Sequence, residues 1–480
     1  MISAPPGRFR DRLAPLVYLS NNWLSRIGVV LVNAAVIFWI FLLPSNLSGE
    51  VANPYFGILA FLLLPGAFFA GLALIPAGLF LRLRRERRQG VYPANFPPLD
   101  LKHAELRKLL SFVGLATIAN GVIATQVSYR AVTYMETVSF CGQTCHTVMQ
   151  PEFAAYQNSP HARVECVKCH IGPGASWFVR SKLSGVGQVF AVMFNTYDRP
   201  IPTPVRNLRP ARETCETCHW PQKFGSDRLR ILTKFADDEA NTATRTVLLM
   251  HIGGPGNHEA GIHGIHLGQG VTIEYAPADA SRQTIPWVSY TDGAGRKTVY
   301  EAAEAKPETA RRLPRRVMDC VDCHNRPTHT FEMPEAAADR ALAAGDIPAA
   351  LPFARKQSVE ILKKPYASRA EAARLIPGTL EQYYQDKHPE VYAQRRAEIA
   401  RAAQAVLAIY DRNVFPAMKV TWGSYPNNLG HTDFPGCFRC HDDQHSSADG
   451  KKITQDCGAC HNLLAMDEAS PKILNDLSLR

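Results

Sequence analysis

Three long apolar runs stand within the first 127 residues of this 480-residue chain. They cover residues 27–43, 55–81 and about 109–127, and each is uncharged and of a length that crosses a bilayer as a helix. The first run lacks a small-residue cleavage site and two more runs follow it, which favours a retained anchor over a cleavable signal peptide. The pattern therefore predicts a membrane anchor of three transmembrane helices within residues 1–127.

The basic residues around these runs predict the orientation of the anchor. Residues 1–26 carry four arginines, residues 82–108 carry eight Lys or Arg, and residues 44–54 carry none. Because cytoplasmic loops hold the excess of basic residues, the amino terminus is expected in the cytoplasm. Everything after about residue 128 is then expected on the periplasmic side of a bacterial cytoplasmic membrane.

Beyond the anchor the apolar residues change period twice. Residues 226–310 hold alternating, strand-like runs, RTVLLMHI, GVTIEYA and WVSYTDGAGRKTVYE, the last with an Asp-Gly turn between its arms. Residues 331–415 are rich in Ala, Glu, Arg and Gln with helical periodicity, as in EVYAQRRAEIARAAQAVLAIY. These patterns predict a mainly α protein with a small β insertion at 226–310 and packing helices within 311–480.

The formal charge of +10 does not indicate a nucleic-acid partner. Residues 1–127 hold 12 Lys and Arg against 5 Asp and Glu, whereas the rest of the chain holds 41 against 38. The basic excess is therefore mostly a consequence of membrane topology, and the periplasmic part is nearly balanced.

The cysteines carry the strongest chemical signal in the sequence. All twelve fall into pairs, and a histidine directly follows each pair. Five pairs have the form C-x-x-C-H and the first has one residue more, C-x-x-x-C-H. The six motifs are Cys141/Cys145/His146, Cys166/Cys169/His170, Cys215/Cys218/His219, Cys320/Cys323/His324, Cys437/Cys440/His441 and Cys457/Cys460/His461.

This arrangement is typical of c-type haem attachment, in which two thiols bond the haem covalently and the adjacent imidazole ligates the iron. Structural zinc is a weaker interpretation, because it needs four ligands per metal and no histidine after every pair. A disulfide framework fits worse in a long chain that is not rich in cysteine. The sequence predicts six covalently bound c-type haems. Three of them crowd into residues 128–225, where haem must supply much of the buried surface.

The remaining histidines are candidates for the second axial position of each iron. His103 lies in a predicted cytoplasmic segment, and His251, His258 and His388 are interpreted as surface or hydrogen-bonded residues. The predicted distal ligands lie close to motifs: His161, His329, His431 and His445, together with one of His263 and His266. Five distal histidines serve six irons, and Met149 lies beside the first motif.

The run S-x-H-A-x-V-x-C-x-x-C-H (Ser159–His170), the nearby methionine and the apolar run leading into the first motif resemble the NapC/NirT family of membrane-anchored, quinol-oxidising multihaem cytochromes. The resemblance covers about 120–225. It implies a first haem at the membrane surface with a methionine ligand and a quinol beside its open face. Residue by residue, it implies Met149 as that ligand, His161 as a ligand of the third haem, and Lys182 in the quinol site.

Three departures from the family pattern leave alternatives open. Because the first motif has an extra residue, the axial ligand of the first iron is open between Met149 and His146. The acidic residue expected soon after the lysine is absent, and Gln188 stands in that region. The three membrane spans and six haems predicted here exceed the one span and four haems that are usual in the family. In this respect the chain resembles the larger inner-membrane multihaem cytochromes of bacteria that respire extracellular acceptors.

A quinol loses two protons with its two electrons, so its site needs a titratable or hydrogen-bonding side chain. Lys182, Gln188, Glu152 and Glu136 are the candidates. The prediction is a quinol dehydrogenase that passes electrons from the membrane quinol pool to a periplasmic cytochrome or reductase. The alternatives are a terminal reductase of the nitrite or hydroxylamine type and a structural haem subunit that anchors a partner reductase.

Overall fold

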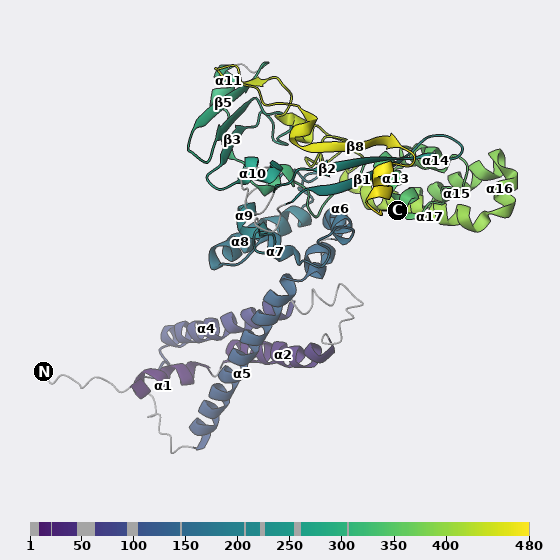
Figure 1. Ribbon diagram of the computed structural model, residues 1–480. Helices are drawn as coiled ribbons and strands as arrows, with labels where there is room; N and C mark the ends of the chain where they lie inside the picture. The colour runs from purple at the N-terminus through teal and green to yellow at the C-terminus, as the bar shows by residue number, and fades with distance from the viewer. Residues whose placement is uncertain are drawn as a thin grey trace. The chain divides into compact units, whose positions relative to one another are not determined.

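The computed structural model of the chain contains two compact units, Met1–Glu136 and Thr137–Arg480 (Figure 1). Helices occur in both units, and all the described strands belong to the second. The structure describes residues 9–20, 22–45, 63–93, 104–144, 146–205, 208–220, 226–253, 261–304 and 307–479.

The first unit consists of four described helices, of which the last three overlap the predicted apolar runs and the first precedes them. They are α1 (Phe9–Ser20), α2 (Trp23–Ser45), α4 (Leu64–Gln89) and α5 (Ala104–Met135). Among the described residues, α4 alone has the length and hydropathy of a membrane span, and Trp23–Val36 forms a shorter apolar helix. Residues 55–62 of the second predicted run lie outside the described residues. The three transmembrane helices therefore stay a prediction.

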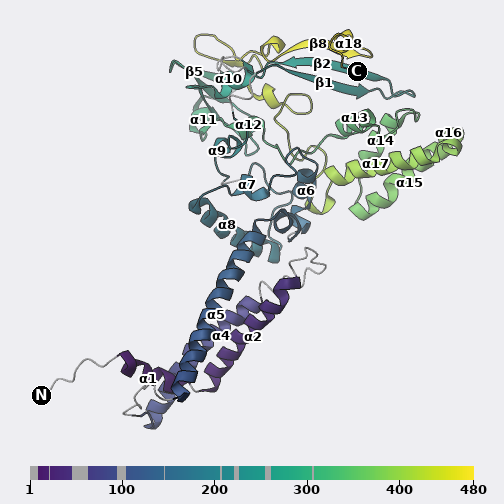
Figure 2. The same ribbon diagram turned by 60° about the horizontal axis from the view of Figure 1, so that its bottom comes forward.

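Helices α2 and α4 run side by side because small residues let their backbones approach closely (Figures 1 and 2). A Cβ atom on Gly71 would lie 2.7 Å from the carbonyl oxygen of Gly28 and 2.8 Å from Cγ2 of Val32. The Ser25 hydroxyl donates a hydrogen bond to the carbonyl oxygen of Ile75 at 3.0 Å. This helix pair is thus held by close backbone packing and one interhelical hydrogen bond.

In the second unit, a bundle without any cysteine forms the largest apolar core. Its helices are α13 (Pro334–Ala344), α14 (Ala354–Leu362), α15 (Arg369–Lys387), α16 (Pro389–Gln394) and α17 (Arg396–Asn413). The buried face of α17 carries Ile399, Ala402, Val406 and Ile409, at the spacing of an amphipathic helix. Ser368 caps α15 by accepting the Glu371 backbone N–H at 3.1 Å. The bundle matches the packing helices predicted within residues 331–415.

Two antiparallel sheets hold the last three cysteine motifs. The three-stranded sheet has the order β1 (Arg228–Phe235), β2 (Ala243–Met250), β8 (His461–Glu468). The five-stranded sheet has the order β6 (Arg316–Val317), β3 (Thr272–Ala276), β4 (Trp287–Thr291), β5 (Lys297–Ala302), β7 (His445–Ser446). Strand β6 ends just before Cys320, β7 follows the fifth motif, and β8 begins at the histidine of the sixth. Sheet pairing therefore fixes the positions of these motifs.

The predicted strand-like runs correspond to β2, β3, β4 and β5, whereas β1 and β8 add strands that the sequence pattern did not predict. The other helical segments are short, except for α8. They are η2 (Phe140–Thr144), α6 (His146–Gln157), α7 (Cys166–His170), α8 (Ala175–Met193), α9 (Ala211–Cys215), α10 (Gly261–Leu267), α11 (Pro307–Arg312), α12 (Cys320–Cys323), η4 (Pro416–Met418), η5 (Gly436–Arg439), η6 (Cys457–Ala459) and α18 (Lys472–Asp476).

Candidate functional site

Motifs two to five each fold as a single helical turn that brings the histidine back over the first cysteine, whereas in the sixth motif a short 3-10 turn leads into β8 at His461. The backbone N–H of His219 donates to the carbonyl oxygen of Cys215 at 2.8 Å, and that of His324 donates to Cys320 at the same distance. The fifth motif forms the same bond, from His441 to the Cys437 carbonyl, at 3.1 Å. One turn places both thiols and the imidazole around one small space, as covalent haem attachment requires.

The first motif differs in backbone as well as in spacing. Residues Phe140–Thr144 form a π-helix, whose wider turn accommodates the extra residue between the cysteines. Gly142 within it is buried against the ring of Phe153, so close that a Cβ atom would not fit. Cys145 and the side chain of His146 lie outside the described residues. Met149 is half-buried on α6, one turn after His146.

Five histidine pairs face each other, and each joins a motif histidine to a histidine from elsewhere. Two imidazoles that ligate one iron from opposite sides have ring centres about 6.3 Å apart, given an iron–nitrogen bond of about 2 Å. The observed separations match this value. They are His161–His219 at 5.9 Å, His170–His329 at 6.2 Å, His263–His324 at 6.3 Å, His266–His441 at 5.8 Å and His431–His461 at 6.3 Å.

Backbone carbonyl groups fix the tautomer of several of these rings. Nδ1 lies 3.2 Å from the Pro327 oxygen in His161, 2.7 Å from the Ile262 oxygen in His266, and 3.0 Å from the Glu152 oxygen in His329. A carbonyl oxygen only accepts, so Nδ1 carries the proton and Nε2 presents its lone pair. Such orientation of the second ring nitrogen is typical of metal-ligating histidines.

The surroundings of several of these histidines also favour the uncharged form of the imidazole ring, which is the form that ligates a metal. Burial lowers the pKa of His263, and burial together with the charge of His263 lowers the pKa of His324. Burial likewise lowers the pKa of His329, where Glu152 opposes and Arg326 assists the shift. The donor set of two thiols and two opposed imidazoles thus fits a c-type haem at motifs two to six.

His445 differs from its predicted role as a distal ligand. Its side chain is 2% exposed, its Nδ1 lies 2.9 Å from Oδ1 of Asp442, and its Nε2 lies 2.7 Å from the carbonyl oxygen of Ile285. Both ring nitrogens are therefore engaged with protein groups, and His445 fastens β7 instead. His266 faces the fifth motif and His263 faces the fourth, so both members of a pair from which one ligand was expected lie opposite a motif histidine.

His251 and His388, which were interpreted as non-ligands, belong to none of the five pairs, although His251 is a neighbour of His461 in the sixth motif. Nδ1 of His251 lies 3.1 Å from Oδ1 of Asp227. His388 packs among Phe353, Tyr383 and Tyr384, with its Nε2 3.3 Å from the Tyr383 hydroxyl. His258 lies outside the described residues.

The motifs lie beside one another in sequence order. The Cys166 thiol hydrogen-bonds that of Cys141, and the Cys215 thiol hydrogen-bonds that of Cys320. Electrostatic interactions link the second motif to the third (Cys169 with Cys215 and Cys218), the fourth to the fifth (Cys323 with Cys437), and the fifth to the sixth (Cys437 with Cys460). Successive motifs are therefore neighbours from the first to the sixth.

Glu152, a predicted quinol-site candidate, occupies a structural junction. Its carboxylate accepts hydrogen bonds from Nη2 of Arg326 at 3.1 and 3.2 Å, and its Oε2 lies 3.2 Å from Nδ1 of His329. Arg326 is 8% exposed and also donates to the His329 carbonyl at 2.6 Å. The pair ties α6 to the segment after the fourth motif and orients His329 toward the second.

The other quinol-site candidates lie on α8 or at the end of α5. Lys182 belongs to α8, with its side chain outside the described residues. Exposed Gln188 donates to the Ser184 hydroxyl at 3.4 Å on the same helix. Glu136 is half-buried, and its backbone N–H closes the end of α5. Lys182 and Gln188 thus share helix α8, whereas Glu152 belongs to α6.

Helix α8 leaves an apolar face exposed. Val179, Val189 and Met193 are 53%, 54% and 68% exposed. With 3.6 residues per turn, position 182 falls on this same face. A lysine position within an exposed apolar face suits an amphiphilic ligand that carries a polar oxygen.

Comparison with known proteins agrees with this geometry. The family model described as NapC/NirT cytochrome c family, N-terminal region, matches residues 104–202. The chain is similar to the cytochrome c-type protein ImcH of Geobacter sulfurreducens, with 43% identity over 451 residues that cover 92% of this chain and 88% of the relative. No solved structure matches the chain.

Proposed function

The chain belongs to the NapC/NirT family of multihaem c-type cytochromes, and from this membership we propose that it oxidises membrane quinol and passes the electrons to a periplasmic cytochrome or reductase. Electron transport through covalently bound haem is the property of the family. The finer proposal is that six haems, one at each motif, form a single conducting series from a quinol site near the first motif.

The observation that carries this proposal is the series of five facing imidazole pairs in motifs that adjoin in sequence order. We assign His161 to the third iron, His329 to the second, His263 to the fourth, His266 to the fifth and His431 to the sixth. Ligation from both sides suits electron transfer, because it leaves no iron position for substrate chemistry. A terminal reductase would need such an open position among these motifs.

The first motif is proposed as the place where electrons enter. The five pairs use every predicted distal histidine except His445, whose nitrogens are both hydrogen-bonded. Met149, which is half-buried on α6, would then help to hold the haem of the first motif, with His146 as the alternative, and quinol would be oxidised beside this haem. The π-helical turn under Phe153 is the local feature that sets this motif apart.

Quinol oxidation delivers two electrons and two protons, and haem supplies an acceptor for one electron at a time. The side chains of the protein must therefore bind the quinol oxygen and let its protons leave. Lys182 is proposed to hydrogen-bond that oxygen, with the exposed apolar face of α8 receiving the ring and tail. Gln188 and Glu136 are the alternatives, whereas the carboxylate of Glu152 is held by Arg326.

The membrane arrangement is part of the proposal. Helices α2, α4 and α5 are proposed to span the bilayer with the amino terminus in the cytoplasm. The basic end of α4, Arg82–Arg88, would then lie on the cytoplasmic side, as the distribution of basic residues predicts. The cysteine motifs would lie in the periplasm, where their acceptor is found.

One experiment tests the proposed reaction directly. Purified protein in detergent is mixed anaerobically with a reduced quinol analogue, and the haem absorption bands are followed. Reduction by quinol without any partner protein supports a quinol dehydrogenase. Reduction by dithionite alone, with none by quinol, would favour the structural anchor subunit instead.

A further inference from the structure

The fourth and fifth cysteine motifs are joined through charged residues that stand between their cysteines. Asp322 lies between Cys320 and Cys323, and Arg439 lies between Cys437 and Cys440. Nη2 of Arg439 donates a hydrogen bond of 2.7 Å to the carbonyl oxygen of Asp322. The variable positions of these two motifs thus form a direct bridge between them.

The Asp322 carboxylate is buried and fully used. Its side chain is 1% exposed, and Oδ1 accepts from the Tyr275 hydroxyl at 2.6 Å, from Nε of Arg316 at 2.8 Å and from Nη1 of Arg282 at 3.0 Å. Oδ2 accepts the backbone N–H of Asp319 at 2.7 Å. The positive charges of Arg282 and Arg316 therefore exceed the single negative charge of Asp322. Asp319 is the other carboxylate nearby.

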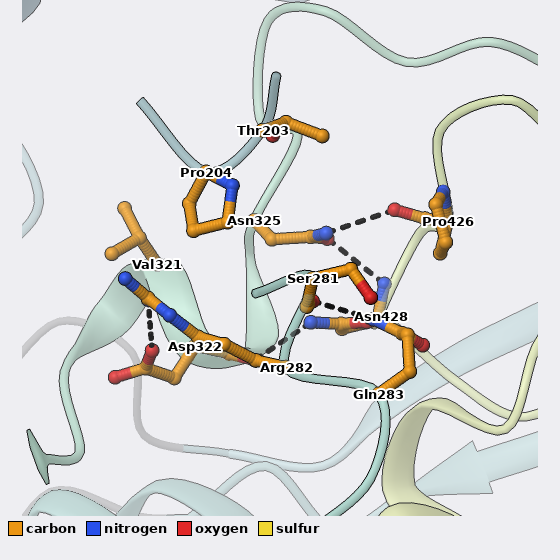
Figure 3. A pocket seen from close by; sticks show the side chains of 10 residues that line it. All are labelled: Thr203, Pro204, Ser281, Arg282, Gln283, Val321, Asp322, Asn325, Pro426 and Asn428. Atoms are coloured by element: carbon orange, nitrogen blue, oxygen red, sulfur yellow. Dashed lines mark hydrogen bonds and ion pairs between the residues drawn. The ribbon is translucent and has the colours of Figure 1, made fainter. Parts of the chain in front are cut away.

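Figure 3 shows this junction at the wall of a small pocket beside the fourth motif, with Arg282 turned toward Asp322. Asn428 donates from Nδ2 to the carbonyl oxygen of Asp322 at 3.1 Å, and Asn325 accepts the Asn428 backbone N–H at 2.9 Å. Side chains from outside the fourth motif, Arg282, Asn428 and Arg439, thus all bond to Asp322. Such a network keeps the charges in fixed positions.

Arg439 brings a positive charge that its own contacts leave unbalanced. Nε donates to the Gly436 carbonyl at 2.8 Å, Nη1 to the Arg282 carbonyl at 2.9 Å, and Nη2 to the Asp322 carbonyl. Within the described part of the chain, Arg439 forms no ion pair. Carbonyl oxygens orient its guanidinium, and they do not neutralise it.

Arg439 is positioned to act on both motifs. It stands between Cys437 and Cys440 in the fifth motif, and its Nη2 contacts the carbonyl oxygen of Asp322, which directly precedes Cys323 in the fourth motif. A group bonded at either motif therefore lies within the electrostatic influence of Arg439.

We propose that Arg439 is a shared cation that raises the reduction potentials of the haems at the fourth and fifth motifs, so that electrons collect midway along the series. Reduction adds one negative charge to a haem, and a fixed cation in a protein interior stabilises the reduced form. Because Arg282 and Arg316 offset Asp322, that carboxylate does not cancel the effect. The inference rests on the proposed attachment of haem at these two motifs.

The test is a spectroscopic redox titration of the full-length holoprotein with chemical mediators, which needs no quinol turnover. Arg439→Gln is expected to lower the potentials of two haems, each by about tenfold in its reduction equilibrium, or about 59 mV for one electron. Arg439→Lys keeps the charge and should keep both potentials near their original values. Arg369→Gln removes an arginine that pairs with Asp411 in the helical bundle, and it should change no potential.

Haem content and low-spin spectra are measured first in every variant, so that a missing haem is recognised separately from a shifted one. Equal shifts in Arg439→Lys and Arg439→Gln would show that hydrogen bonding, and not charge, is responsible, and no shift in Arg439→Gln would overturn the proposal. If Arg439→Gln loses a haem, Arg282→Gln decides. It leaves Asp322 balanced by Arg316 alone and keeps Arg439, so two haems should still have potentials above the others, and the absence of two such haems in both this variant and the unmodified protein contradicts the proposal.

Discussion

His263 and His266 lie one turn apart on α10 and face different cysteine motifs, the fourth through His324 and the fifth through His441. A single helical turn therefore provides one proposed axial ligand for each of two proposed haems. Side chains three residues apart on a helix project from neighbouring positions, so the two irons would be near neighbours. This local connection parallels the bridge from Arg439 to Asp322 between the same motifs.

The assignment of distal histidines predicts separate effects for His266 and His445. His266→Ala should convert one low-spin haem to high-spin, because the iron at the fifth motif would lose its second imidazole. His445→Ala should leave the spin state of every haem unchanged, since that ring is bonded to Asp442 and Ile285. Electron paramagnetic resonance and visible spectra measure both. A high-spin signal in the His445 variant, with none in the His266 variant, would reverse the assignment.

Glu152 is predicted to matter for stability and not for quinol oxidation. Glu152→Gln leaves the 8%-exposed Arg326 without its carboxylate, which should lower the free energy of unfolding by about 3 kcal/mol. The hydrogen bond from His329 goes to the backbone oxygen of Glu152, so the second haem should stay low-spin. Denaturant unfolding and quinol-driven haem reduction are measured side by side.

The control for this variant is a similar ion pair at the surface. Glu332→Gln removes the partner of Arg340, a pair with 26% and 42% exposed side chains, and should cost less than about 1 kcal/mol. A large loss of quinol oxidation in Glu152→Gln at unchanged stability would return Glu152 to the quinol site.

The local parts of this molecule followed from the sequence because their signals are local. The haem motifs, the packing helices within residues 331–415 and strands β2 to β5 all rest on spacing over a few residues. The β8 segment HNLLAMDE has no clear alternation, and it becomes a strand by pairing with β2, which lies far away in the sequence. Long-range pairing of this kind leaves no periodic trace.

Ligand assignment shows the same limit. His445 was favoured because it lies close to the fifth motif, but the carbonyl of Ile285 that engages it comes from a distant segment. His329 was expected to serve another iron, and only the fold brings it to His170. Asp322 and Arg439 were overlooked because the positions between paired cysteines were treated as unspecified. The sequence did contain a signal for these two residues, because each lies between paired cysteines as the charged residue of its run, CVDC or CFRC.

The close contact between α2 and α4 predicts an effect of one added methyl group. Gly71→Ala places a Cβ atom within 2.7 Å of the Gly28 carbonyl oxygen, so the helices must separate, at a cost of about 1–3 kcal/mol. Gly66→Ala on the same helix meets nothing within 4 Å and should be neutral or slightly stabilising. Thermal unfolding in detergent compares the two. Equal melting temperatures would mean that α2 and α4 are not packed in this way.

The cofactor content is predicted to be six covalent haems in a protein that fractionates with the membrane. Twelve cysteines form six motifs, and the double variant Cys457→Ala/Cys460→Ala should lower the haem-to-protein ratio by one while the other five stay attached. The ratio is measured by pyridine haemochrome and intact-protein mass. A ratio near four in the unmodified protein, or recovery in the soluble fraction, would contradict the prediction.

The quinol site gives the sharpest prediction. Lys182 occupies the exposed apolar face of α8, together with Val179, Val189 and Met193. If its ammonium group binds the quinol oxygen, Lys182→Ala should slow haem reduction by quinol about 100-fold, the usual magnitude for a group that assists proton transfer. Reduction by dithionite, the haem count and the spin states should stay unchanged, because no proposed axial ligand is touched.

The matched control is Arg180→Ala on the same helix. Position 180 falls on the opposite side of α8 from position 182, and the Arg180 guanidinium lies 5.1 Å from the centre of the Trp177 ring. This variant removes one positive charge from α8 and should oxidise quinol at the normal rate. Equal slowing by both variants would indicate a general electrostatic effect of α8. A normal rate in Lys182→Ala would exclude Lys182 as the binding group, and Gln188 and Glu136 would then be the residues to replace.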